Sequence, residues 1–472
     1  MIDPLLIPNQ ADRADESDMT QPLEHKDELI SHFLSGAKPR EQWRIGTEYE
    51  KVAVSKDDGR ALPFSGPRGV EELLRRLIDR YGYEPDGEHG RIIALKGGRA
   101  PITIEPGGQI ELSGEQCETI HCAHREFTVH IEQLIELGHE LDATILGLGM
   151  QPVSRIDEIE LLPKDRYHIM YPYMARQGRL GQRMMKQTAG VQANLDYSDE
   201  ADAMRKLRIS MGMVPVVYAI FANSPLSDGR LNGYQSYRGH IWEDTDRDRC
   251  GTLEFAFRDD AGFEDYVDYA LNVPMYFLER DHRYNNLTVP PGITFRQFME
   301  RGWGTERATI EDWSNHLTTI FTEVRLKKYI EIRTADSQPP PLMLSLPALC
   351  KGILYDSDCM TGAWDLIKRW SYAERLALTD AAQKIGLDAR AGRIKLQELA
   401  LELINIAMIG LARQRCLNER GEDESIYLLR MLDQVRMGHN QASLTIERWK
   451  GRWNYDVQRL VEGCSYEAEA TF

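Results

Sequence analysis

The chain has 472 residues, with 57 lysines and arginines against 74 aspartates and glutamates, so its formal net charge is −17. A hydrophobic fraction of 42% and a charged fraction of 28% are typical of a globular protein with a buried core. The acidic excess argues against non-specific binding to nucleic acid or to an anionic membrane, because both attract basic surfaces.

Residues 1–21 end in a polar stretch without apolar periodicity, which predicts a flexible N-terminal tail. Hydrophobic periodicity then predicts helices over 23–34, 70–81, 117–146, 201–221 and 266–278, and strands over 43–54, within 92–112, and over 191–197, 253–258 and 329–333. From about residue 347 the sequence is strongly helical, with the clearest periodicity over 373–385 and 394–417. Strands first and helices last predict an α+β fold built on antiparallel strands, with residues 22–472 as one domain.

The longest uncharged apolar run, residues 213–222, is about half of the roughly 20 residues that a membrane span needs, so no span is expected. The N-terminus lacks the basic and apolar regions of a signal peptide. An odd number of scattered cysteines, seven in all, does not suggest a disulfide framework. We therefore expect a cytoplasmic protein.

The common nucleotide and zinc motifs are absent from the sequence. No phosphate-binding Gly-x-x-x-x-Gly-Lys-Ser/Thr loop occurs, and the residues after Gly147-Leu-Gly149 break the dinucleotide fingerprint. His121, Cys122 and His124 fall on one predicted helix, but not at i and i+4, so a partly exposed helix face is favoured over a zinc site.

The informative feature is a set of carboxylates placed on predicted strands. Glu48 and Glu50 are two residues apart, so a strand presents both side chains on one face. Glu105 and Glu111 flank the turn signal at 106–108, which predicts a hairpin with an acid on each side.

Two further predicted strands have the same design. Gln192, Asn194 and Asp196 share one face of the first, and Glu331 and Arg333 share one face of the second. An all-acid face is unfavourable without a cation, and clustered oxygen ligands suit Mg²⁺ or Mn²⁺. An ordinary solvent-facing sheet also alternates polar and apolar residues, so this pattern alone leaves both interpretations open.

At these segments the chain resembles glutamate–cysteine ligases of the plant and proteobacterial type. The matching motifs occur in the family's order, from about residue 22 to at least 375, and include WRIGTEYEK at 43–51, EPGGQIELSG at 105–114, VQANLD at 191–196, RGHIWEDTD at 238–246, YVDYALNVPMYF at 266–277 and EVRLKKYIEIR at 323–333. The resemblance implies a curved antiparallel sheet like the catalytic fold of glutamine synthetase, with acids on the concave side and helices packed outside. Residues 22–472 would then form a single catalytic ligase domain.

The resemblance also implies the reaction and its partners. ATP would convert the γ-carboxylate of glutamate to γ-glutamyl phosphate, and the amine of cysteine would then displace phosphate, in the first step of glutathione biosynthesis. The partners would be the small molecules glutamate, cysteine and ATP, with no nucleic acid and no membrane. The sequence leaves the oligomeric state open.

Individual roles follow from the same resemblance. The ligands of two or three Mg²⁺ ions, with Mn²⁺ as the alternative ion, would be Glu48, Glu50, Glu105, Glu111, Asn194 and Glu331. Arg333 would contact the transferring phosphate, and Lys96 is the second catalytic and nucleotide-binding candidate. Arg238 would bind the glutamate α-carboxylate, and Tyr276 and Tyr171 would line the cysteine pocket.

Two other functions compete with this one. A related ATP-dependent carboxylate–amine ligase with a different amine acceptor would share the metal and ATP residues. A non-catalytic Mg²⁺- or nucleotide-binding regulatory protein would not need the complete set of ligands. Plant members of the family are regulated by disulfides, but the corresponding segments here, 288–294 and 342–347, contain no cysteine, so we expect that switch to be absent.

Overall fold

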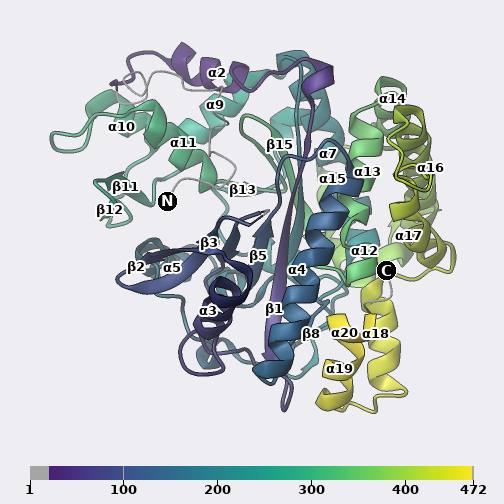
Figure 1. Ribbon diagram of the computed structural model, residues 1–472. Helices are drawn as coiled ribbons and strands as arrows, with labels where there is room; N and C mark the ends of the chain where they lie inside the picture. Colours follow the sequence, from purple (N-terminus) through teal and green to yellow (C-terminus); the bar gives the residue numbers. More distant parts are fainter. Residues whose placement is uncertain (1–20, 99, 470–472) are drawn as a thin grey trace.

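An antiparallel sheet forms the centre of the molecule (Figure 1). The computed structural model describes residues 21–98 and 100–469, so the tail predicted over 1–21 lies outside the described residues except for Gln21. Within these ranges nine strands form the sheet in the order β14-β15-β7-β1-β5-β4-β3-β2, with β6 paired to the second half of β1. All of these pairings are antiparallel, which confirms the predicted α+β architecture.

The sheet strands are β1 (Ile45–Ser55), β2 (Glu84–Glu88), β3 (Arg91–Lys96), β4 (Ile102–Ile104), β5 (Ile110–Ser113), β6 (Ala143–Leu146), β7 (Gly190–Leu195), β14 (Val324–Leu326) and β15 (Ile330–Asp336). Shorter two-stranded pairings join β8 (Leu226–Ser227) to β9 (Arg230–Leu231), β10 (Cys250–Gly251) to β13 (Phe321–Thr322), β11 (Phe277–Arg280) to β12 (Arg283–Asn286), and β16 (Arg390–Ala391) to β17 (Ile394–Lys395).

The helices that follow the last strand of the sheet gather on one side of it and extend to the C-terminus (Figure 1). The helices before the last strand of the sheet are α2 (Lys26–Leu34), α3 (Val70–Tyr81), α4 (Ile120–Glu140), α5 (Asp165–Gln177), α6 (Gly181–Gln187), α7 (Glu200–Phe221), α8 (Tyr237–Glu243), α9 (Phe263–Asn272), α10 (Phe295–Arg301) and α11 (Ile310–Thr318). After it come α12 (Pro340–Met343), α13 (Ser345–Leu354), α14 (Ser357–Ile367), α15 (Tyr372–Ile385), α16 (Leu396–Gln414), α17 (Ile426–Arg436), α18 (Gln441–Lys450), α19 (Val457–Cys464) and α20 (Tyr466–Glu469). Helices α4, α7 and α13 pack directly against the strands.

Strand β1 divides its side chains between the two faces of the sheet. Tyr49 is fully buried and its ring lies 4.8 Å from that of Phe127 on α4. Because side chains alternate along a strand, Glu48 and Glu50 project from the opposite face. The helical layer therefore forces these two carboxylates to the side of the sheet that α4 does not cover.

Three predicted elements differ from the structure. Residues 143–146 form strand β6 rather than the end of a helix, because the chain leaves α4 and passes through Asp142, whose φ is +51°. Residues 254–257 form a short 3₁₀ helix instead of a strand. The predicted helix over 266–278 ends at Asn272 and is followed by β11. In each case apolar spacing in a short segment did not distinguish strand from helix.

One buried core includes residues from Leu23 to Tyr466, and a smaller cluster packs Trp449, Leu460 and Val461 against Val54. The division into a tail and one catalytic domain stays a prediction. Cys117 and Cys122 form a disulfide at the start of α4, with their Cα atoms 5.7 Å apart, which the sequence did not suggest. Within the described ranges no helix combines the length and the apolar character that a bilayer span requires.

A buried ion pair connects the C-terminal helices to α4. Lys351 Nζ lies 2.6 Å from Glu424 Oε2, and Glu424 Oε1 accepts the backbone N–H of Ile120. Both charged side chains are at most 4% exposed. Loss of one partner would leave a buried charge without compensation.

We predict that Glu424→Gln lowers the free energy of unfolding by about 3–5 kcal/mol, the range for breaking a buried ion pair. The matched control is Asp365→Asn, which breaks a pair of the same 2.6 Å length whose side chains are 48% and 55% exposed. The control should cost less than about 1 kcal/mol. Urea unfolding followed by circular dichroism measures both, and equal losses would contradict the prediction.

Candidate active site

A pocket of about 210 Å³ lies on the face of the sheet that carries the acids. Strands β1, β4, β5, β7, β14 and β15 form its floor, and helices α5, α6, α8 and α11 and the β11–β12 hairpin form its walls. Its lining includes the five predicted strand acids Glu48, Glu50, Glu105, Glu111 and Glu331 together with Arg333. Residues from distant parts of the sequence thus converge on one site.

Strand register explains this convergence. Glu50 lies opposite Glu111 in the pairing of β1 with β5, and Glu331 lies opposite Asn194 in the pairing of β15 with β7. Glu105 is positioned by the tight turn between β4 and β5, where Gly108 N–H donates to the Glu105 carbonyl. The expected hairpin with an acid on each side is confirmed.

Burial and mutual repulsion disfavour the charged forms of three of the acids. Burial, with a contribution from Glu50, raises the pKa of Glu105 to about 7. Burial, with contributions from Glu105 and Glu50, raises the pKa of Glu111 to about 8. The pKa of Glu50 is also raised, mainly by burial. Oxygen-rich groups held in this way fit a divalent cation, which would offset the repulsion.

Glu331 has the opposite electrostatic environment. Burial alone would raise its pKa, but Arg325, Lys327 and Arg333 outweigh burial and hold the pKa well below its usual range. Arg325 Nη2 donates to Glu331 Oε1 at 2.8 Å, and Arg333 Nη1 donates to Oε2 at 3.2 Å. The charge of Glu331 is therefore balanced by protein cations in this conformation, and its role as a metal ligand stays a prediction.

Asn194 contacts one of the acids but is not part of the described lining of the pocket. Its Nδ2 donates to Glu48 Oε1 at 2.9 Å, whereas its buried Oδ1 has no hydrogen-bond partner among the described residues. An amide oxygen that has no hydrogen-bond partner and lies next to a carboxylate is a suitable ligand for Mg²⁺.

Four predicted binding residues do not belong to the described lining of the pocket. Lys96 is 56% exposed and pairs with Asp86 at 3.0 Å. Tyr276 is buried against the Arg249 guanidinium, 3.9 Å from its ring centroid, and the Tyr171 ring lies 4.9 Å from Lys186 Nζ. Arg238 is 3% exposed and lies behind Gly190, where an added Cβ would come 2.5 Å from Arg238 Nη2.

Helix α5 supplies cations that the sequence analysis missed. Lys164, Arg166 and Tyr167 line the pocket at the start of α5. Burial lowers the pKa of Lys164 to about 8. Neither Lys164 nor Arg166 has an ion-pair partner among the described residues, and Arg166 Nε has no hydrogen-bond acceptor there. The sequence Pro163-Lys-Asp-Arg-Tyr167 carries two cations, but no element was predicted there; Pro172 interrupts the helical pattern of α5.

A separate group of possible ligand atoms lies at the tip of the β2–β3 hairpin. Glu88, His89 and Asp165 place one ligand atom each within 4.8 Å of one another. Glu88 Oε2 accepts the backbone N–H of Asp165 at 2.8 Å, and His89 Nε2 lies 2.9 Å from Asp165 Oδ1. These contacts fasten the hairpin to the start of α5, which is sufficient to explain the cluster.

Comparisons with known proteins find a matching family model and similar sequences. The model of "Glutamate-cysteine ligase family 2 (GCS2)" matches residues 44–463. The chain is 41% identical over 450 residues to the chloroplastic glutamate–cysteine ligase of Brassica juncea, covering 95% of this chain and 85% of the relative. The chloroplastic enzyme of Arabidopsis thaliana is also 41% identical, with 95% and 84% covered.

The fold is similar to a solved structure of low sequence identity. It matches the crystal structure of glutamate–cysteine ligase from Francisella tularensis in complex with AMP with a TM-score of 0.53 and 14% identity, over 91% of this chain and 89% of that one. With the family model matching most of the sequence and plant relatives covering nearly all of it, the chain belongs to glutamate–cysteine ligase family 2.

Proposed function

We propose that this protein uses ATP to join the γ-carboxylate of glutamate to the amine of cysteine, the first step of glutathione biosynthesis. The observation that carries the proposal is the convergence of Glu48, Glu50, Glu105 and Glu111 in one buried pocket beside Arg333. A carboxylate is a poor electrophile, so phosphorylation to γ-glutamyl phosphate must precede attack by the amine. Such a reaction requires charge compensation on the phosphates and a site sheltered from water.

The acids of the pocket would hold Mg²⁺, which supplies charge compensation to the ATP phosphates when bound. Candidate ligands are Glu48, Glu50, Glu105, Glu111 and Glu331, with Asn194 beside them. The spread of these groups along several strands supports more than one ion, since Mg²⁺ usually takes one or two protein carboxylates and keeps several waters. The count of two or three ions and the choice of Mg²⁺ over Mn²⁺ remain predictions.

The two ends of the pocket would bind different anionic groups. Arg333 Nη1 reaches Gln192 Oε1 and Glu331, so a small rearrangement would free it for the transferring phosphate. Lys164 and Arg166, from the start of α5, have no ion-pair partner among the described residues and would attract the remaining phosphate or carboxylate oxygens. Lys164 replaces Lys96 as our second candidate for contact with phosphate.

Arg238 remains our candidate for the glutamate α-carboxylate. Its Nη1 and Nη2 donate to the carbonyls of Thr334 and Arg333 at 3.2 and 3.0 Å, and its buried Nε has no acceptor among the described residues. The guanidinium lies beside Gly190, behind the lining of the pocket, and its charge acts on Glu50. A carboxylate bound there would satisfy donors that the protein leaves unpaired. For Tyr276 and Tyr171 no contact in the structure favours a cysteine-binding role.

The alternative ligase with another amine acceptor would use the same acids and cations, so a substrate panel must separate the two. The non-catalytic alternative gives no reason for the full set of acids to converge. A cytoplasmic location stays a prediction, and the plant relatives are named as chloroplastic.

We predict Mg²⁺-dependent ADP release that requires glutamate and is highest with cysteine as acceptor. Glu105→Gln should reduce this turnover by more than about 100-fold, because loss of a direct ligand should exceed the roughly 10- to 100-fold loss that follows removal of an outer-shell partner. Among the described residues the Glu105 side chain accepts no hydrogen bond, and burial disfavours its charged form. The variant should therefore stay folded. Equal turnover with other acceptors would support the alternative ligase, and an active variant would remove Glu105 from the site.

We predict that Lys164→Met lowers kcat/KM for ATP or glutamate by at least about tenfold, because a charge-assisted contact is worth roughly 1.5–3 kcal/mol. Lys96→Met should change it by less than about twofold, since Lys96 pairs with Asp86 outside the pocket. Steady-state kinetics of both variants decides between the two lysines. A large effect at Lys96 with none at Lys164 would restore the original assignment.

A further inference from the structure

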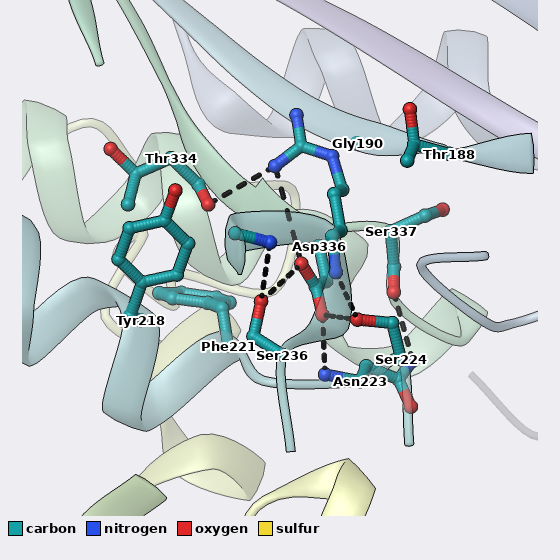
Figure 2. A network of polar contacts seen from close by, with 12 residues as sticks. Thr188, Gly190, Tyr218, Phe221, Asn223, Ser224, Ser236, Thr334, Asp336 and Ser337 are labelled. Atoms are coloured by element: carbon teal, nitrogen blue, oxygen red, sulfur yellow. Dashed lines mark hydrogen bonds and ion pairs between the residues drawn. The ribbon is translucent and has the colours of Figure 1, made fainter. Parts of the chain in front are cut away.

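The Asp336 carboxylate is the centre of a buried polar network at the end of β15 (Figure 2). Its Oδ2 accepts the backbone N–H of Asn223 at 2.8 Å and the hydroxyl of Ser224 at 2.7 Å. Its Oδ1 accepts the hydroxyl of Ser236 at 2.9 Å. The side chain is completely buried. Its bonds join segments that are 100 or more residues apart in the sequence.

Both serine hydroxyls also accept hydrogen bonds from the backbone of helix α8. The Ser224 hydroxyl accepts the backbone N–H of Arg238 at 3.0 Å. The Ser236 hydroxyl caps α8 by accepting the backbone N–H of Gly239 at 3.2 Å. Asp336 therefore orients both hydroxyls so that they receive the N–H groups on either side of the Arg238 Cα atom. It fixes the backbone from which the Arg238 side chain extends.

The Asp336 charge also acts on the Arg238 side chain. Arg238 Nη1 lies 4.0 Å from Asp336 Oδ1, and both groups are at most 3% exposed. In this low-dielectric environment the carboxylate offsets the cost of burying the guanidinium. Asp336 thus contributes to the position of both the backbone and the charged group of Arg238.

Gly190 connects the network to the acids of the pocket. Gly190 lies opposite Asp336 in the β15–β7 pairing, and its N–H donates to Glu50 Oε2 at 2.5 Å. The absence of a side chain at Gly190 admits the Arg238 guanidinium, and Gly149 admits Asp336 itself, since a Cβ there would lie 2.5 Å from Asp336 Cβ. Gly149, which belongs to the Gly147-Leu-Gly149 sequence that does not continue as a dinucleotide fingerprint, packs against this network.

We propose that Asp336 is a positioning residue for substrate binding: through Ser224 and Ser236 it holds Arg238 in place to receive the glutamate α-carboxylate. This inference rests on the proposed function, in which Arg238 binds glutamate. Asp336 itself touches neither the substrate nor the lining of the pocket. Its effect must therefore pass through Arg238.

The test is steady-state ADP release by the full-length protein carrying Asp336→Asn. We expect KM for glutamate to rise at least tenfold, while KM for cysteine and for ATP changes less than twofold. Gly190→Ala, which displaces the guanidinium without touching Asp336, should give the same selective pattern. A purely structural role would instead lower kcat through a smaller active fraction and leave KM for glutamate unchanged, and that result would overturn the proposal.

A double-mutant cycle tests whether Asp336 acts through Arg238. In an Arg238→Lys background, Asp336→Asn should raise KM for glutamate less than twofold further, whereas a full additional tenfold rise would overturn the proposal. If Asp336→Asn does not fold, Ser224→Ala takes its place in the same cycle, with an expected three- to tenfold rise. The matched control is Ser371→Ala, which removes the serine cap of α15; its hydroxyl bonds Glu374 rather than any member of the network, so every KM should stay unchanged.

Binding of glutamate, measured by isothermal titration calorimetry in the presence of Mg²⁺ and a non-hydrolysable ATP analogue, separates this inference from the proposed function. Wild-type protein that binds glutamate but does not turn over cysteine would refute the ligase assignment. In that case, glutamate binding that Asp336→Asn weakens at least tenfold would still support the Asp336 proposal, and unchanged binding would overturn it.

Discussion

Repulsion between buried carboxylates is the constraint on which the rest of this structure depends. Strand register places Glu50 opposite Glu111, and the β4–β5 turn adds Glu105 to the same pocket. Burial and proximity raise the pKa of all three acids. A protein gains no stability from such an arrangement, so it is best explained by cations that arrive with the substrates.

Nearby lysines and arginines neutralise only some of these acids. Arg325, Lys327 and Arg333 neutralise Glu331, and Arg238 acts on Glu50 from behind Gly190. On the other face of β1, Lys51 Nζ is fully buried and donates to the carbonyl of Tyr49. The acids nearest the α5 wall, Glu105 and Glu111, have no direct ion pair among the described residues. Lys164 and Arg166 line the same part of the pocket without an ion-pair partner among the described residues, and they offset the charge of Glu105 only in part.

The sequence predicted which acids lie together where they occur on a regular strand or flank a recognisable turn. A period of two was enough to place Glu48 with Glu50, and the Pro-Gly-Gly turn was enough to pair the strands that carry Glu105 and Glu111. It was uninformative where position depends on tertiary packing. Lys96, the last residue of β3, pairs with Asp86 outside the pocket, and the α5 cations lie in a segment whose helical pattern is interrupted by proline. The Asp336 network joins four distant segments, which no local pattern reveals.

The most direct test of the central claim is the number of protons released when Mg²⁺ and a non-hydrolysable ATP analogue bind. Calorimetry in buffers of different ionisation enthalpy measures this number. Because the pKa values of Glu105 and Glu111 are raised to about 7 and 8, Glu105 is partly and Glu111 mostly protonated at pH 7, and both must be deprotonated to bind a cation. We predict net proton release at pH 7 that falls towards zero by about pH 9, and that Glu105→Gln reduces it. Absence of proton release at pH 7, with Mg²⁺ bound, would contradict the account.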